Sequence, residues 1–184
     1  MRKILIVSNY NYAEFVEACL ASAIAQSCKF DLLLFIDDGS TDDSVQRVES
    51  GFANCSALRV IRKANGGQLS CFNAALPYVE QDDLVFFMDA DDVYPPDYVE
   101  SVLEQYRRGD DFIFCRARMF TPANNEAPTN SSRVSTEDSY VISSSCSLTR
   151  FSRCWIGSPT SALVLSGRLL REILPYPHAQ DWIT

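Results

Sequence analysis

The sequence has 184 residues, a hydrophobic content of 47% and a charged content of 22%, which predict one globular domain with a sizeable core. Its formal net charge is −8 and it has no basic stripe, which excludes a nucleic-acid backbone as the main partner. The seven cysteines are odd in number, scattered and without a Cys-x-x-Cys pair, so we expect free thiols in a reducing compartment.

Apolar runs and helical patterns alternate along the first 120 residues. Strands are expected at 3–7, 32–36, 58–61, 84–88 and 112–114, and helices at 12–26, from about 42, at 68–78 and at 97–108. Strands that alternate with helices predict parallel strands joined by right-handed crossovers. We expect Asn11 to cap the helix at 12–26 in a capping box with Glu14, and Ser40 or Thr41 to cap the next helix.

The second half of the chain is less regular. Residues 121–139 are rich in Pro, Asn, Ser and Thr and predict an exposed loop, and 140–153 predict an irregular strand or turn. A short strand at 162–165 is expected to lead into a helix that Ser166 caps. The chain stops three residues after Asp181, just beyond a proline-containing loop, so we expect a domain that is cut short.

The apolar run from Leu84 to Met88 ends abruptly in three carboxylates, Asp89, Asp91 and Asp92. Such a run predicts a strand buried on both faces, and acids at its C-terminal end are typical of ligand sites in open α/β sheets. Carboxylates this close repel one another, so either a cation or open water must face them. Asp89 and Asp91 can share one divalent cation, and all-oxygen ligands favour Mg or Mn over Zn. The alternative is a polar turn in which Asp91 or Asp92 caps a helix.

A second acidic pair, Asp37 and Asp38, follows the strand expected at 32–36. The C-terminal ends of parallel strands meet at the same edge of a sheet, so the two acidic groups are expected to be neighbours. A helix cap accounts for either acid of the pair alone. Two acidic groups at equivalent strand ends favour a binding site instead.

Four short motifs, each after an expected strand, together resemble the family 2 glycosyltransferases, which have the GT-A fold. They are Asn9-Tyr10-Asn11-Tyr12, the run from Asp37 to Asp42, Asn65-Gly66-Gly67-Gln68 with Asn73, and Asp89-Ala90-Asp91-Asp92 as a D-x-D element. The resemblance implies an α/β, Rossmann-like, mostly parallel sheet flanked by helices, with an irregular C-terminal part. It implies a single domain over 1–184, with a nucleotide-sugar-binding half at 1–120 and an incomplete acceptor-side half at 121–184.

The resemblance also implies a role for each acid. Asp91 is expected to bind the metal, Mn or Mg, and Asp89 to contact the ribose or the same metal. Asp38 or its neighbour Asp37 is expected to accept a hydrogen bond from the nucleobase. A carboxylate can only accept, so the base must offer a ring N–H, as uracil and guanine do. A UDP-sugar donor is therefore favoured, then a GDP-sugar.

Two further groups of residues complete the expected donor site. The turn from Ser8 to Asn11, which contains Asn9 and Tyr10, is expected to lie along the base. Gly66 and Gly67 are expected to let the backbone approach the donor closely, and a plain turn is the alternative reading for them.

The family places a general base late in the domain, usually in a Glu-Asp pair, and here Asp181 in Gln180-Asp181-Trp182 is the candidate. The expected activity is inverting, hexosyltransferase-type transfer to a hydroxyl of a saccharide or a lipid-linked saccharide. Three features depart from the family pattern: Ser8-Asn9 replaces a frequent proline, Gln180 replaces the first acid, and the segment expected after Asp181, which shapes the acceptor side in the family, is missing from this sequence. The run 4–7 is too short for a signal peptide or a membrane span, so a cytoplasmic protein is expected, and peripheral association with the inner face of the membrane stays open.

Two other functions stay open. A sugar-phosphate nucleotidyltransferase also uses a metal on a related fold, but it should carry a Gly-rich, basic loop where this chain has Asn-Tyr-Asn-Tyr. A non-catalytic module that binds nucleotide sugars would keep the same donor residues without turnover. A Rossmann dehydrogenase is not expected, because no G-x-G-x-x-G follows a strand.

Overall fold

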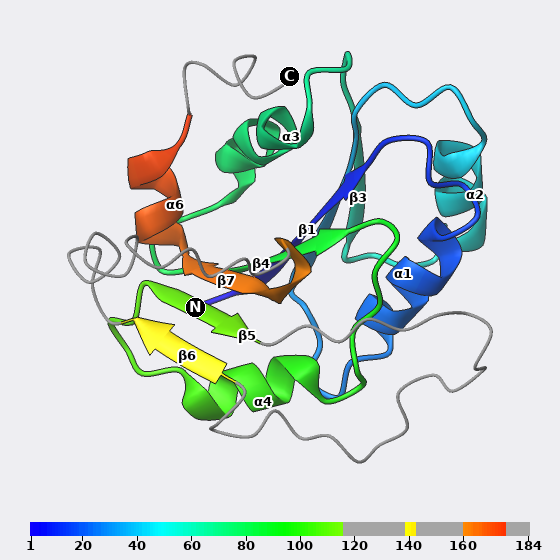
Figure 1. Cartoon of the computed structure of the whole chain (residues 1–184). Coiled ribbons are helices and arrows are strands. Elements are labelled where there is room, and N and C mark those ends of the chain that lie inside the picture. The colour runs from blue at the N-terminus through cyan, green and yellow to red at the C-terminus, as the bar shows by residue number, and fades with distance from the viewer. Residues whose placement is uncertain (116–138, 143–159, 176–184) are drawn as a thin grey trace.

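A computed structural model describes residues 1–115, 139–142 and 160–175 (Figure 1). Its elements are β1 (Lys3–Asn9), α1 (Val16–Ile24), β2 (Leu32–Asp37), α2 (Ser44–Gly51), β3 (Leu58–Arg62), α3 (Gln68–Ala75), η1 (Leu76–Tyr78), β4 (Leu84–Asp89), α4 (Tyr98–Gln105), β5 (Phe112–Cys115), β6 (Ser139–Ile142), η3 (Thr160–Ala162), β7 (Leu163–Ser166) and α6 (Gly167–Ile173). The strands form one seven-stranded sheet in the order β3-β2-β1-β4-β7-β5-β6.

The first four strands of the chain are parallel, as expected from the alternation of strands and helices. β1 pairs with β2 and with β4, and β2 pairs with β3. The register sets Asn9 opposite Asp37 and Ser8 opposite Asp89. The acids at the ends of β2 and β4 therefore flank the end of β1 on one edge of the sheet, as the sequence predicted.

β5 runs in the same direction as the four strands before it, as expected, but in the described part of the chain it pairs with none of them. β7 runs antiparallel to β4 and to β5 and lies between them. β6 is also antiparallel to β5. The alternation along the chain could not show this, because β7 begins only at Leu163, long after β5 begins at Phe112.

Alternate residues of the buried strands divide the core into two layers. Leu5, Phe35, Phe86 and Met88 face α1, α2 and α4. Ile4, Ile6, Leu34, Val85 and Phe87 face α3 and α6 on the other side. Full burial of an aliphatic or aromatic side chain contributes about 1.5–3 kcal/mol, so these strands hold the sheet rigid under its loops.

Two of the expected helix caps are wrong. α1 begins at Val16 and not at 12, and α2 begins at Ser44 with Asp43 at its N-cap position, in both cases without a side-chain cap. Asn11 adopts a φ of 59°, which directs it away from a helix start. The Ser166 cap of α6 is confirmed, because Ser166 Oγ accepts the Leu169 N–H at 3.0 Å.

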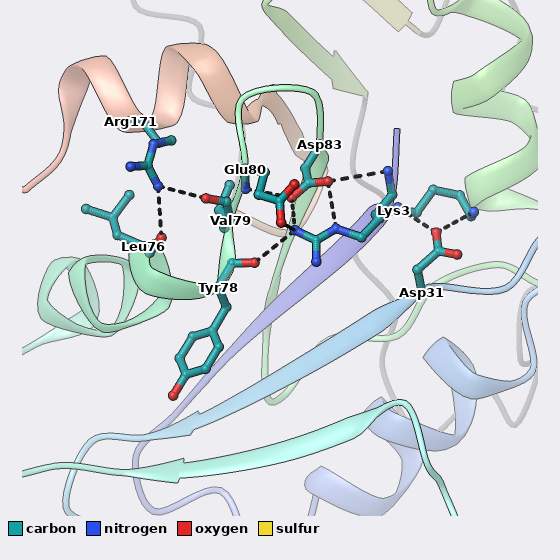
Figure 2. Close-up of polar contacts among 9 residues, drawn as sticks. Lys3, Asp31, Leu76, Tyr78, Val79, Glu80, Asp83 and Arg171 are labelled. Carbon is teal, nitrogen blue, oxygen red and sulfur yellow. Dashed lines mark hydrogen bonds and ion pairs between the residues drawn. The ribbon is translucent and has the colours of Figure 1, made fainter.

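Ion pairs close the edge where the parallel strands begin (Figure 2). Lys3 Nζ lies 2.6 Å from Asp31 Oδ2. Buried Asp83 accepts hydrogen bonds from Arg2 Nε at 2.9 Å, from Arg2 Nη2 at 2.6 Å and from the Glu80 N–H at 2.7 Å. Burial alone would raise the pKa of the Asp83 carboxyl, but the contacts with Arg2 and Glu80 hold it below its ordinary value.

The same edge continues through α6. Arg168 Nη2 lies 2.7 Å from Asp111 Oδ1, and Ser166 Oγ donates to the same carboxylate oxygen at 2.7 Å. Arg171 donates to the carbonyl oxygen of Val79 at 2.8 Å, which ties α6 to the turn before β4 (Figure 2). None of the helices within the described ranges has the length and apolarity that crossing a bilayer would require.

Candidate functional site

A cavity of about 260 Å³ opens at the edge where β1, β2 and β4 end. It is lined by Ser8, Asn9, Tyr10, Tyr12, Asp38, Gln68, Cys71, Asp89 and Asp91. Five of these are residues that the sequence singled out: Asn9, Tyr10, Asp38, Asp89 and Asp91. Among the other candidates, Asn11, Asp37, Gly66 and Gly67 lie in the neighbouring loops and do not line the cavity. Asp181 lies outside the described residues.

The loops after β1 and β2 are fastened to each other by side-chain hydrogen bonds. Asn9 Nδ2 donates to Asp37 Oδ1 at 2.8 Å and to Ser40 Oγ at 3.0 Å. Asn11 Oδ1 accepts the Thr41 N–H at 2.8 Å. These contacts explain why Asn11 is not a helix cap, since its side chain bonds to the adjacent loop instead.

Asn9 leaves one buried acceptor without a partner. Its side chain is 2% exposed, and within the described part of the chain Oδ1 has no hydrogen bond. The orientation of the amide is fixed, because Nδ2 lies among three acceptors: Asp37 Oδ1, Ser40 Oγ and Ser44 Oγ. Leaving a buried acceptor unpaired costs about 1–3 kcal/mol, so a donor from a ligand would be favourable here.

The two acids of the second motif have different surroundings. Asp37 Oδ1 accepts from Asn9 and from Ser40 Oγ, and its Oδ2 accepts the Ser40 N–H at 3.1 Å. Asp38 lines the cavity and forms an ion pair with Lys63. The structure therefore directs Asp37 into the scaffold and Asp38 toward the cavity.

The loop after β3 holds Asp38 in place. The N–H groups of Gly66 and Gly67 donate to Asp38 Oδ1 at 3.0 Å and to Asp38 Oδ2 at 2.8 Å. Gly67 has a φ of 80°, which favours glycine. A carboxylate offers about four acceptor positions, and Oδ2 here receives only the Gly67 N–H among the described residues. One acceptor position of Asp38 is left for a ligand.

Gly39 brings the loops after β2 and β3 into backbone contact. Its φ is 78°, and a Cβ at this position would lie 2.9 Å from the Asn65 nitrogen and 3.3 Å from the Lys63 oxygen. Any other residue would be both strained and in collision with backbone. The glycine is therefore required by close packing between two loops of the site.

Asp89 is held by neutral donors. Ser8 Oγ donates to Asp89 Oδ1 at 3.1 Å, and Gln68 Nε2 donates to the same oxygen. Burial raises the pKa of the Asp89 carboxyl to about 6, and the charges of Asp92 and Asp91 add to that rise. No Lys or Arg pairs with these three acids within residues 1–115, 139–142 and 160–175.

Ser161 of η3 binds the side chain of Asp92, which is the third acid of the group. Its hydroxyl donates to Asp92 Oδ2 and accepts the Asp89 backbone N–H at 2.9 Å. Asp91 is exposed and lines the cavity. The carboxylates left to face a ligand are therefore those of Asp89 and Asp91.

These two carboxylates fit a divalent cation that a ligand helps to bind. In the described part of the chain, no cluster of three His, Cys, Asp or Glu side chains could hold a metal by itself. Mg²⁺, however, is commonly bound through one or two carboxylates together with phosphate oxygens of the substrate. Asp89 and Asp91 supply the protein part of such a set.

Aromatic side chains form the outer rim of the cavity. Tyr10 is 46% exposed and Tyr12 is 36% exposed, and both line the cavity. The charge of Asp91, followed by burial and the charge of Asp89, raises the pKa of the Tyr12 hydroxyl. Flat apolar rings beside carboxylates suit a ligand with an aromatic base and a charged tail.

The two thiols nearest the site are unsuited to nucleophilic chemistry. Cys71 is 1% exposed, and burial raises the pKa of its thiol to about 12. Burial also raises the pKa of Cys19, whose Sγ lies 3.7 Å from the carbonyl oxygen of Asp89. A thiolate is the reactive form of cysteine, so neither side chain is poised to attack a substrate.

Sequence reasoning missed two residues that shape the site, Lys63 and Ser161. It included Ser8 in the turn after the first strand and Gln68 in the third motif, but it gave neither a contact with Asp89. Lys63 follows the last residue of β3, and its partner Asp38 follows the last residue of β2. Ser161 is 69 residues from Asp92, and nothing in the sequence indicated that contact.

Comparisons with known sequences give a family and several relatives. The profile of the family described as Glycosyl transferase family 2 matches residues 4–167. The chain is 27% identical over 184 residues to an uncharacterized glycosyltransferase from Nostoc sp. (strain PCC 7120 / SAG 25.82 / UTEX 2576), covering 95% of this chain and 54% of that protein. It is 30% identical over 109 residues to a chondroitin synthase from Escherichia coli, covering 56% of this chain and 15% of the relative. The chain thus spans about half the length of the first relative and less of the second.

Two solved structures resemble this one. The crystal structure of S. aureus TarS 1-349 in complex with UDP-GlcNAc superposes with a TM-score of 0.66 at 20% identity, covering 94% of this chain and 47% of that chain. The mannosyltransferase PcManGT from Pyrobaculum calidifontis, in complex with GDP-Man and Mn²⁺, gives a TM-score of 0.58 at 24% identity, covering 64% and 36%. At these identities the likeness shows the fold alone, and it confirms the expected α/β architecture.

Proposed function

The chain belongs to glycosyl transferase family 2 and has the GT-A fold, and from that premise we propose that it binds the nucleotide-sugar donor of an inverting, hexosyltransferase-type enzyme. The donor favoured by the site is a UDP-sugar, bound with Mn²⁺ or Mg²⁺. The single observation that carries the proposal is the shared cavity at the end of β1. It is lined by Asp38, directly after β2, and by the pair Asp89 and Asp91 at and just beyond the end of β4.

Asp38 supports recognition of a base with a ring N–H. It keeps one free acceptor position, and a carboxylate has no proton to donate at neutral pH. The unpaired Oδ1 of Asn9 is a second acceptor, on the residue whose carbonyl oxygen accepts the Asp38 N–H at 2.8 Å. Uracil and guanine offer the matching N–H, whereas cytosine and adenine present an acceptor at the equivalent ring position. Tyr10, exposed on the cavity wall, can stack on the base.

Asp89 and Asp91 support a cation-dependent diphosphate site. Both are carboxylates without a protein cation among the described residues, and they face the cavity that Asp38 also lines. A bound divalent cation would neutralise the charge that develops on the diphosphate as it leaves. The protein's own part is to present the two carboxylates to one cavity.

The transfer step needs a base on the acceptor. In an inverting reaction the acceptor oxygen bonds to the anomeric carbon while the bond from that carbon to the diphosphate breaks, and the base takes the acceptor proton. By likeness to the family, Asp181 is proposed for this role, and a saccharide or lipid-linked saccharide hydroxyl is proposed as the acceptor.

We place the protein in the cytoplasm, with peripheral contact at the inner membrane face left to experiment. Cys19, Cys28, Cys55 and Cys71 are free thiols, which supports a reducing compartment.

Calorimetry with UDP in Mn²⁺ and in EDTA tests the donor site. We expect UDP to bind more tightly in Mn²⁺ than in EDTA, and Asp91→Asn to remove most of the difference. The matched control is Asp82→Asn, an exposed carboxylate on the turn before β4 that should change neither value. Equal UDP affinity in Mn²⁺ and EDTA would contradict the cation role.

A turnover assay separates the remaining candidate functions. Release of UDP with formation of a glycoside supports the transferase. Formation of a nucleotide sugar from a sugar phosphate and a nucleoside triphosphate would support the nucleotidyltransferase instead. Tight, Mn²⁺-dependent UDP binding without turnover in any longer form of the protein would support a binding module.

A further inference from the structure

Gln68 occupies a position that the proposed function does not use. It is the first residue of α3, lines the cavity, and directs its amide nitrogen at Asp89. The same nitrogen donates to Ser8 Oγ at 3.2 Å, and Ser8 Oγ donates in turn to Asp89 Oδ1 at 3.1 Å. Three polar groups thus close a ring of hydrogen bonds, and both donors that reach Asp89 end on the same oxygen.

The orientation of the Gln68 amide is determined by its partners. Its Oε1 accepts from Thr160 Oγ1 at 3.4 Å, on the segment that precedes β7. Turning the amide over would set Oε1 against the carboxylate oxygen of Asp89, which repels it. Gln68 therefore presents a fixed N–H donor to Asp89 and leaves Oδ2 without a partner among the described residues.

The donors on Asp89 are neutral, as are those on buried Asp37, whereas two other buried acids have cationic partners. Asp38 pairs with Lys63, and Asp83 pairs with Arg2. A cationic side chain at Gln68 would orient Asp89 equally well, but it would cancel the negative charge that attracts a divalent cation. A neutral donor orients the carboxylate and preserves its charge.

We propose that Gln68 is a positioning residue for the cation of the donor complex: with Ser8 it holds Oδ1 of Asp89 and leaves Oδ2 to the cation. This inference rests on the proposed function. Groups that orient a metal-binding side chain typically change metal affinity by 10–100-fold when they are lost. The contribution of Gln68 therefore appears in the Mn²⁺ dependence of UDP binding.

Calorimetric titration of UDP at a series of Mn²⁺ concentrations tests the proposal. The readout is the Mn²⁺ concentration that gives half of the gain in UDP affinity. Gln68→Met keeps the length of the side chain and removes the donor, and it should raise this concentration about tenfold. Gln68→Lys keeps a donor but adds a positive charge, and it should raise the concentration further than Gln68→Met does. A residue that only filled space would not order the two variants in this way.

The matched control is Gln46→Met, an exposed glutamine on α2 that should keep the wild-type value. Unchanged melting temperatures show that the variants fold. Wild-type Mn²⁺ dependence in Gln68→Met or in Gln68→Lys overturns the role of Gln68 while the proposed function stands. If Mn²⁺ adds nothing to UDP binding by the wild-type protein, the cation role and the inference fall together.

Discussion

At the edge where the parallel strands begin, acids are matched with bases, whereas at the edge where they end the acids of β4 have no basic partner in the described chain. Asp31 and Asp83 pair with Lys3 and Arg2. Asp89 and Asp91 have only neutral donors or none. Both edges belong to the same rigid sheet, so the difference lies in the side chains. Charge left uncompensated marks the edge at which we propose that the donor binds.

The charge pairing of Asp38 is intermediate between those of the two edges. The residue lies at the edge where the strands end, yet Lys63 and two backbone N–H groups hold it. A base-reading carboxylate needs a fixed position and one free acceptor, and it does not need an uncompensated charge. A cation-binding carboxylate needs the charge itself.

The largest effect is expected from a substitution at Asp181. It tests whether transfer needs this residue in addition to the acids at the edge where the parallel strands end. Asp181→Asn should cut transfer by about a hundredfold or more in a form of the protein that is active, because the amide cannot take the acceptor proton. UDP affinity should stay nearly unchanged, since the base acts on the acceptor. Wild-type turnover in the variant would move the base elsewhere.

Removing the charge of Asp89 most directly reduces the difference in charge pairing between the two edges. Asp89→Asn should raise the Mn²⁺ concentration that gives half of the gain in UDP affinity by about a hundredfold, which is the upper end of the range for groups around a metal. The same change should raise the free energy of unfolding of the unliganded protein by about 1 kcal/mol, because a buried charge without a cation partner is removed. Calorimetry and urea denaturation measure the two effects. A variant less stable than the wild type would show that the charge of Asp89 is compensated.

Asp38→Asn sharpens the distinction between reading a base and binding a cation. The amide can donate as well as accept, so discrimination of UDP over CDP should fall by about 1–3 kcal/mol. The Mn²⁺ dependence should survive. Competition binding with the two nucleotides measures the ratio, and Asp37→Asn is the comparison variant. Retained selectivity in both variants would remove the base contact from this loop.

The smallest effect is expected at the opposite edge. Asp83→Asn should lower the free energy of unfolding by about 1.5 kcal/mol, through weaker hydrogen bonds to Arg2 and Glu80, with UDP affinity unchanged. The folded protein holds the pKa of Asp83 below its ordinary value, so this stabilisation is present above about pH 4 and is lost as the pH falls through the lowered pKa. Denaturation of wild type and variant should therefore converge in acid. A difference that persists at low pH would assign the effect to packing.

Local patterns in the sequence were sufficient for the parallel core and for the acids at its edge. The strand that ends at Asp89 and the strand that ends at Asp37 are each continuous apolar runs, and parallel pairing then brings their ends together. The sequence could not separate Asp37 from Asp38. That distinction depends on Lys63 and the Gly66 and Gly67 N–H groups, which approach Asp38 only in the folded chain.

The helix starts and β7 were beyond local reasoning for a different reason. Asn11 is a residue type that favours helix N-caps. Its side-chain oxygen Oδ1 instead accepts the Thr41 N–H from another loop, a contact that local sequence patterns do not show. β7 enters the sheet between strands that precede it in the chain. In both cases a distant segment outcompetes the local preference.

The contact at Gly39 has a consequence for changing donor preference by design or by recombination. A Cβ at residue 39 would strike the backbone of Asn65, and Asp38 is bonded to Lys63, Gly66 and Gly67, so the segments after β2 and β3 are shaped to each other. Exchanging 37–44 alone with a homologue should disturb a junction that exchanging 37–44 together with 63–70 preserves. If these segments select the nucleotide, they must be exchanged together. Chimeras with a junction between the two segments should therefore be functional less often than chimeras that keep both from one parent.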